Sequence, residues 1–130
     1  DHSPASRLKT LSYLDNVLAR VEARDAGADE ALMLNAAGEI ACAAAANIFW
    51  MSGGRLFTPA LDCGVLAGTM RARVLAAADV QEVRAGPEAL VSAEAIFLTS
   101  SLIGLRAVSE LDGRGLGGWC GLEALAASAA

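Results

Sequence analysis

Short apolar runs alternate with turn signals along the chain, and this alternation constrains the fold more than any other feature. Such runs are typical of β-strands when Gly, Asn or Pro bound them. The clearest pair, residues 47–51 and 55–58, flanks Ser52-Gly53-Gly54 and stops at Pro59, which cannot donate to a ladder. We therefore predict a hairpin there. A second pair of strands is predicted at 30–34 and 39–42, separated by the turn-like stretch 35–38. Further strands are predicted at 81–84, 95–101 and 105–109.

Helical patterns lie between these predicted strands. Apolar residues recur at three- and four-residue steps over 8–26, before the stop signal Gly27, and again over 65–78. A helical turn or short helix is predicted at 87–92, and a terminal helix at 119–127. The 130 residues are 55% hydrophobic, enough for one core. Strands and helices around one core indicate an α/β or α+β domain.

Composition excludes several classes of function. Ten basic against fifteen acidic residues give a formal charge of −5, without the basic cluster of a nucleic-acid surface. The apolar stretch 40–51 is shorter than the roughly 20 residues of a membrane-spanning helix. Three widely spaced cysteines and the single histidine, His2, favour neither a disulfide framework nor a metal site. We expect a cytoplasmic protein without metal, nucleic-acid or membrane partners.

Small residues precede the predicted helix in the stretch 64–71. Unpaired backbone N–H groups and the helix dipole stabilise a phosphate at such a terminus. Gly68 has no Cβ and would permit close approach, although Gly64 and Gly68 could equally shape a loop and pack a helix. No Gly-Lys-Ser/Thr follows, so this is not a Walker loop.

Hydroxyl and amide side chains follow or interrupt the predicted strands. Ser100 and Ser101, with Thr99, end an apolar strand, where they could bind the same phosphate or satisfy their own backbone. Asn47 could donate to a ligand or fix a strand end.

Lys9 falls in the first turn of the predicted helix 8–26. A lysine amine can form a Schiff base with an aldehyde cofactor once neighbours lower its pKa, whereas most lysines in such places are solvated. Tyr13 lies four residues later, on the same helical face, where it could touch the same ligand or be a half-buried core residue.

In this order, the motifs resemble the class IV, fold-type IV, pyridoxal-phosphate enzymes, which include branched-chain and D-amino acid aminotransferases and 4-amino-4-deoxychorismate lyases. The resemblance implies a linker remnant at 1–7 and the C-terminal, lysine-bearing domain at 8–130, a mixed-sheet pseudo-barrel with flanking helices. The matching segments, within residues 7–113, are 8–14, 28–32, 46–50, 57–59, 64–71 and 93–101.

The resemblance also implies roles for individual residues. Lys9 would be the Schiff-base lysine and a proton carrier, and Tyr13 would lie near the cofactor's phenolic oxygen. The remaining cofactor-binding positions would be Cys42 at the ring nitrogen, Asn47, and Gly68, Thr69, Met70, Ser100 and Ser101 at the phosphate end.

Cys42 marks a departure from the family pattern. Family members usually carry a glutamate five residues before Asn47, where it pairs with the pyridine nitrogen; Glu39 is three residues too early, and an odd offset in a strand points to the opposite face. A neutral thiol stabilises a pyridinium poorly and weakens the electron sink. Transamination should then suffer more than a reaction that forms an aromatic product.

This reasoning, with Trp50 and Met70 as further markers, predicts a 4-amino-4-deoxychorismate lyase-like enzyme of folate biosynthesis that releases 4-aminobenzoate and pyruvate. The alternatives are an aminotransferase acting on branched-chain or D-amino acids, and a degenerate, non-catalytic member of the family.

The N-terminal domain of family members, roughly a hundred residues, has no counterpart in this sequence. We therefore expect a fragment or a truncated homologue that binds the cofactor weakly and has little or no turnover alone. Apolar surface where that domain would pack favours self-association, and family members are usually homodimers.

Overall fold

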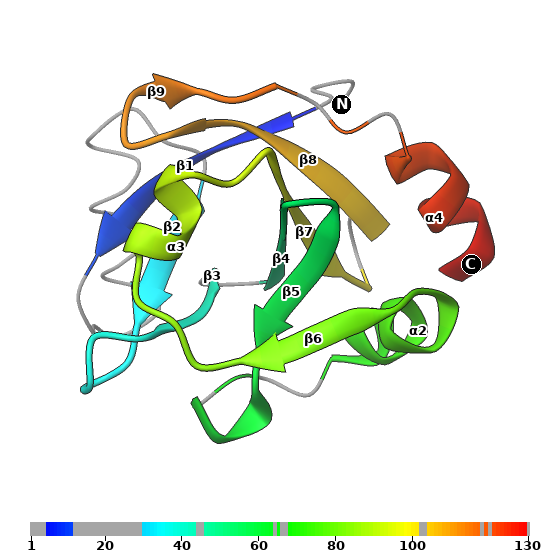
Figure 1. Cartoon of the computed structure of the whole chain (residues 1–130), viewed down its shortest axis with the longest axis horizontal. Coiled ribbons are helices and arrows are strands. Elements are labelled where there is room, and N and C mark those ends of the chain that lie inside the picture. The colour runs from blue at the N-terminus through cyan, green and yellow to red at the C-terminus, as the bar shows by residue number, and fades with distance from the viewer. Residues whose placement is uncertain are drawn as a thin grey trace.

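The computed structural model describes residues 5–11, 30–43, 46–63, 65, 68–101, 104–117, 119 and 121–129. Its strands are β1 Ala5–Leu11, β2 Glu30–Leu34, β3 Ile40–Ala43, β4 Asn47–Ser52, β5 Arg55–Pro59, β6 Val80–Val83, β7 Ala95–Ser100, β8 Gly104–Leu111 and β9 Arg114–Gly115. Its helices are the 3-10 helix η1 Leu61–Cys63, and α2 Thr69–Ala77, α3 Glu88–Val91 and α4 Leu122–Ala129 (Figure 1).

The strands form one mixed, nine-stranded sheet in the order β3-β2-β1-β8-β7-β4-β5-β6, with β9 paired to β8. β1 runs parallel to β2 and β8, and β5 to β6; the other pairs are antiparallel. Leu32 of β2 and Val83 of β6, from near opposite ends of this order, belong to one apolar cluster. The sheet therefore curls around its core, and the predicted mixed α+β architecture is confirmed.

The two faces of β4 and β7 bury different clusters. Ile48 and Leu98 point into the curled sheet. Phe49 and Phe97 point to the other face, where their rings stack with centroids 5.1 Å apart. α2 and α4 lie side by side over that second face, which Val74 of α2 helps to bury (Figure 1). Because both faces are covered, these strands read as continuous apolar runs.

The predicted hairpins are confirmed, because their turns are specified locally. β4 and β5 pair in antiparallel register from Trp50 with Phe57 to Ser52 with Arg55. Gly53 and Gly54 supply the positive φ angles of the turn, +60° and +77°. β2 and β3 pair likewise.

The helix predicted at 8–26 is wrong at its start. Residues 8–11 belong to β1, which pairs in parallel with β2, and residues 12–26 lie outside the described residues. Lys9 is thus in a strand rather than in the first turn of a helix. Residues 5–7, assigned to a linker, pair with β8. Parallel pairing depends on residues far along the chain, and here it overrides the local three- and four-residue period.

Other boundaries move less. α2 begins at Thr69 rather than at residue 65, and α4 spans Leu122–Ala129 rather than 119–127. In the described part of the chain, no helix has both the length and the apolar character of a membrane span.

Candidate active site

Lys9 lies in β1, in register with Ala31 of β2. The last pair between β1 and β8 is Leu8 with Leu111, so Lys9 sits one position beyond the end of β8. Lys9 is also the only lysine among the 130 residues. The spacing of the motifs does not take this fact into account. The backbone of the single lysine is thus part of the sheet. Tyr13 lies outside the described residues.

Backbone pairing connects Lys9 with Cys42. Leu11, two residues after Lys9, pairs with Met33 of β2, and Met33 pairs with the half-buried Cys42 of β3. Only β2 separates the two strands, which are about 10 Å apart at the usual strand spacing. Lys9 and Cys42 therefore lie on neighbouring parts of the same sheet.

The turn between β3 and β4 extends this connection to Asn47. Ala43 and Ala46 form an isolated bridge across the turn. Cys42 precedes the bridge in β3, and Asn47 follows it in β4. Asn47 in turn pairs with Thr99 of β7. Strand pairings and this bridge thus connect β1, the strand of Lys9, with the strand of Thr99.

Asn47 also contacts the start of α2. Its side chain is 4% exposed, and a Cβ added at Gly68, the N-cap position of α2, would lie 2.5 Å from Asn47 Oδ1. Gly68 has an ordinary extended conformation, φ −68° and ψ 147°. The lack of a side chain is therefore required by the approach of Asn47 rather than by backbone strain.

The start of α2 has the features of an anion site. Gly68 makes no side-chain capping bond, and the first turn holds no acidic residue. The first amides of a helix have no intrahelical acceptor, and the dipole makes this end positive. Thr69 is exposed and Met70 half-buried, so solvent reaches this end of the helix.

Thr99 adds a buried hydroxyl beside this terminus. It is fully buried, and among the described residues its Oγ1 is one of two buried side-chain polar atoms without a partner. As the register partner of Asn47, it shares a sheet face with the residue that contacts Gly68. Ser100 ends β7 and Ser101 follows in an exposed turn. The sequence argument considered all three hydroxyls and kept the two serines as cofactor-binding positions. Only the fold reveals that Thr99 is buried.

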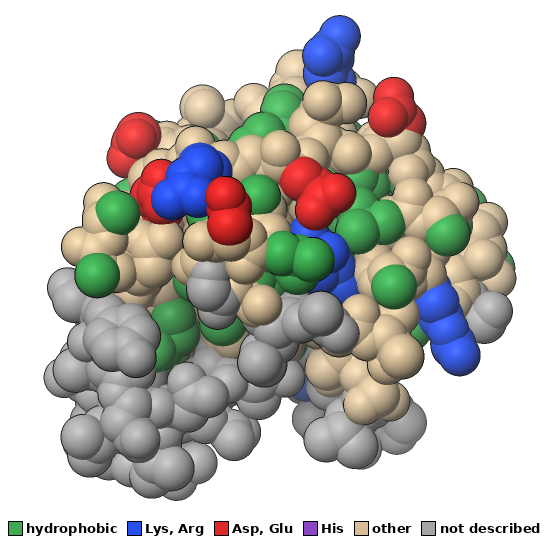
Figure 2. Space-filling model, turned by 90° about the horizontal axis from the view of Figure 1, so that it is seen from below, with side chains coloured by type: hydrophobic (Ala, Val, Ile, Leu, Met, Phe, Trp, Pro, Cys, Tyr) green, Lys and Arg blue, Asp and Glu red, His purple; other side chains and the backbone are tan. Residues whose placement is uncertain are grey.

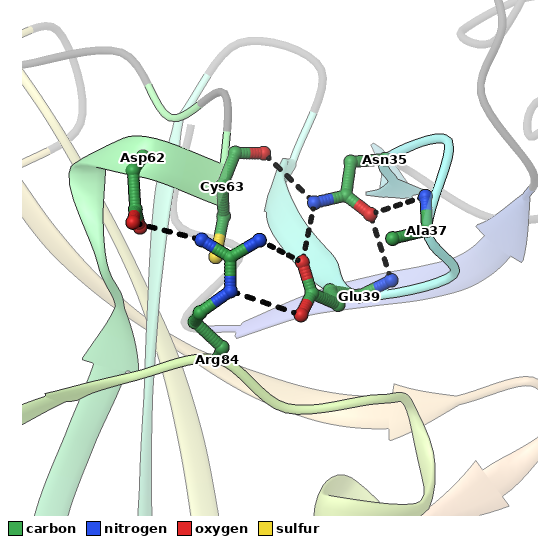
Figure 3. A network of polar contacts seen from close by, with 6 residues as sticks. All are labelled: Asn35, Ala37, Glu39, Asp62, Cys63 and Arg84. Atoms are coloured by element: carbon green, nitrogen blue, oxygen red, sulfur yellow. Dashed lines mark hydrogen bonds and ion pairs between the residues drawn. The ribbon is translucent and has the colours of Figure 1, made fainter.

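Glu39 is the nearest carboxylate before Cys42 in the sequence, and its carboxylate accepts hydrogen bonds from Arg84 and Asn35 (Figure 3). Arg84 donates from Nη2 to Glu39 Oε1 at 2.9 Å and from Nε to Oε2 at 3.2 Å. Asn35 Nδ2 donates to Glu39 Oε1 at 3.0 Å and to the Cys63 carbonyl at 3.2 Å. Arg84 Nη1 also pairs with Asp62 at 2.8 Å. The network fastens η1 to the β2–β3 turn.

These contacts shift three pKa values. The hydrogen bond from Asn35, followed by those from Arg84, lowers the pKa of Glu39 below its ordinary 4.5. The Glu39 bond raises the pKa of Arg84, and burial raises that of the Cys63 thiol. Glu39 is therefore an ionised structural group. On the face seen in Figure 2, acidic and basic side chains are interspersed, without one dominant sign.

Comparison with known proteins identifies the family. The sequence model of class IV aminotransferases matches residues 1–111. A probable branched-chain-amino-acid aminotransferase of Aquifex aeolicus is 32% identical over 124 residues, 90% of this chain and 40% of that protein. Aminodeoxychorismate lyase of Bacillus subtilis is 33% identical over 102 residues, 75% of this chain and 35% of that protein.

Solved structures share the fold. The branched-chain aminotransferase of Thermoproteus uzoniensis superposes with a TM-score of 0.92 at 27% identity, over 98% of this chain and 51% of that one. An aminotransferase from Brucella abortus, bound to the cofactor pyridoxal phosphate, gives 0.89 at 23% identity, over 95% and 52%. The chain thus spans about half the length of these structures, and less of the curated relatives.

Proposed function

This chain belongs to the class IV aminotransferase family, and from that premise we propose that Lys9 anchors pyridoxal phosphate in a lyase like the aminodeoxychorismate enzyme. The family uses this cofactor, which when bound supplies an electron sink for the bonds at the substrate's α-carbon. Lys9 is the sole lysine of the sequence, and an amine there can also carry a proton to and from substrate.

The residues around the start of α2 fit the cofactor's phosphate. Gly68 brings the helix start close to the sheet, and the amides of Thr69 and Met70 are the donors a phosphate would accept. Hydroxyls of Ser100 and Ser101 would complete the group. The unpaired, fully buried Thr99 Oγ1 lies on the same sheet face as Asn47, which supports a polar ligand at this place.

The residue beside the cofactor's pyridine nitrogen decides which reaction is favoured. Cys42 occupies the position at which a carboxylate would pair with the pyridine nitrogen, and the carboxylate of Glu39 is engaged by Arg84 and Asn35. This is the observation that favours a lyase. A neutral thiol gives weak support to a charge-delocalised carbanion, whereas formation of an aromatic ring drives release of 4-aminobenzoate and pyruvate.

An aminotransferase is the second candidate, because the relatives that match this chain include proteins named as branched-chain aminotransferases. Incubation of the complete gene product with aminodeoxychorismate and, separately, with branched-chain or D-amino acids plus 2-oxoglutarate separates the two. Release of 4-aminobenzoate supports the lyase. Amino-group transfer without 4-aminobenzoate contradicts it, and a colourless protein without cofactor by mass spectrometry would indicate a non-catalytic member.

We extend the proposal to the whole protein's setting. A second domain would complete the substrate pocket, because this chain spans about half of the related structures. A homodimer is proposed because members of the family are usually homodimers, and light scattering that shows only monomer would contradict it. Three cysteines at wide spacings, which do not suggest a disulfide framework, support the reducing cytoplasm as the location.

A further inference from the structure

Arg71 is a buried cation in the first turn of α2. It is 4% exposed, and one nitrogen, Nη2, donates both to the Pro59 carbonyl at 3.1 Å and to Glu82 Oε1 at 2.8 Å. Pro59 closes β5 and Glu82 belongs to β6. One guanidinium therefore fastens the beginning of α2 to two adjacent strands.

This placement is electrostatically costly for an isolated helix. A positive side chain near a helix N-terminus faces the positive end of the dipole, and no acidic residue stands in this turn to offset it. The only carboxylate that pairs with Arg71 in the described part of the chain is Glu82, whose side chain is 46% exposed. Arg71 Nε is buried without a partner. The turn thus carries more positive charge than its neighbours offset.

Packing alone does not require a guanidinium here. Met70 and Val74 already hold α2 on the cluster that contains Phe97. Replacing a buried ion pair by apolar residues of similar volume is often neutral or stabilising. What an apolar residue cannot supply is the double hydrogen bond to β5 and β6, or the positive charge in the same turn as the amides of Thr69 and Met70.

We infer that Arg71 is a positioning residue for the phosphate end of the cofactor, an inference that rests on the proposed function. Its two hydrogen bonds to Pro59 and Glu82 form a clamp. This clamp fixes the position and direction of the first turn of α2, so that the amides of Thr69 and Met70 point at one place. Its charge raises the potential there for a dianion. The side chain acts through the helix and through its positive charge, and its hydrogen bonds are to Pro59 and Glu82.

The test compares pyridoxal phosphate with pyridoxal, which lacks the phosphate. The dissociation constant of pyridoxal divided by that of pyridoxal phosphate isolates the phosphate's contribution from that of the ring and the lysine. We expect Arg71→Met in the complete gene product to reduce this ratio about tenfold, a magnitude typical of favourable, partly buried helix-terminus charges. Arg73→Met is the matched control, an exposed arginine on the same helix, and should change the ratio less than about twofold.

A merely structural role would weaken both ligands equally and leave the ratio unchanged, which would overturn the inference. If Arg71→Met does not fold, Arg71→Lys carries the test, because it retains the charge without the fork geometry of the guanidinium. The ratio should then fall about threefold, between the wild-type and methionine values expected from charge and clamp together; a wild-type ratio would contradict the clamp. A wild-type protein that binds neither compound would instead refute the proposed function itself.

Discussion

Asn47 Oδ1 occupies the space in which a side chain at Gly68 would begin, 2.5 Å from the ideal Cβ position. The contact joins the first residue of β4 to the residue that starts α2. Because the backbone of Asn47 also pairs with that of Thr99 of β7, a single residue relates two strands to the helix terminus proposed to bind phosphate.

Gly68→Ala should therefore displace the start of α2 or the Asn47 side chain. Overpacking of this kind costs about 1–3 kcal/mol. We expect the free energy of unfolding to decrease by this amount, and the affinity for the cofactor to decrease as well. Urea unfolding measures the first, and a cofactor titration the second. In Asn47→Ala/Gly68→Ala the combined loss should be smaller than the sum of the single losses. Gly117→Ala, whose added Cβ meets nothing within 4 Å, is the control; equal losses in both alanine variants would contradict the account.

Two fully buried threonines should respond differently to valine. Thr58 Oγ1 donates to the Ile48 carbonyl at 2.7 Å, whereas Thr99 Oγ1 is buried without a partner. Thr58→Val should cost about 1–3 kcal/mol in unfolding free energy, and Thr99→Val should be neutral or stabilising in the cofactor-free protein. Thermal and urea unfolding of the two variants provide the comparison. A loss at Thr99 as large as that at Thr58 would show that Thr99 does have a protein partner.

Glu39 should make the free energy of unfolding depend on pH in the acidic range. Its folded-state pKa is held below the ordinary 4.5 by Asn35 and Arg84, so its contribution is present above that value and is lost as pH falls through the lower, folded-state pKa. The stability difference between wild type and Glu39→Gln should be largest at neutral pH and shrink below about pH 4.5. Unfolding curves from pH 7 to pH 3 test this, and a difference that grows with acid would have the wrong sign. Arg84→Met should reduce the same acid dependence.

Cys42→Glu should restore support for a protonated pyridine nitrogen. We expect transamination to rise at least about tenfold relative to 4-aminobenzoate release, because one pKa unit of added pyridinium stabilisation corresponds to a factor of ten. Both activities are measured on the complete gene product, with Cys42→Ser as a neutral control. An unchanged ratio in the glutamate variant would show that residue 42 does not act on the ring.

Local chemistry made part of this fold predictable. The glycines at 53 and 54 fix the β4–β5 turn, and the strands beside it follow from their apolar runs. The sequence placed Lys9 in the wrong kind of element, because its strand exists only through pairing with β2 and β8. The helical stripe that begins at Leu8 contains no information about those distant partners.

The site was predictable to the same extent. Gly68 and Asn47 stood out separately in the sequence, but their contact depends on how α2 crosses the sheet. Thr99 and Arg71 have no local signal, because a hydroxyl or a guanidinium without its full set of partners becomes unusual only when the fold buries it. Glu39 could be set aside from its offset, and the Arg84 contact gives the physical reason.

Borohydride reduction of the cofactor-loaded complete gene product tests the central claim most directly, because it turns a lysine–cofactor imine into a stable secondary amine. Trypsin cuts after Arg7 and Arg20 and does not cut at a modified Lys9. The account predicts the phosphopyridoxyl mass on the peptide spanning 8–20, and none after reduction of Lys9→Ala. A phosphopyridoxyl group found only on another residue, or a loaded protein in which Lys9 stays unmodified, would contradict it.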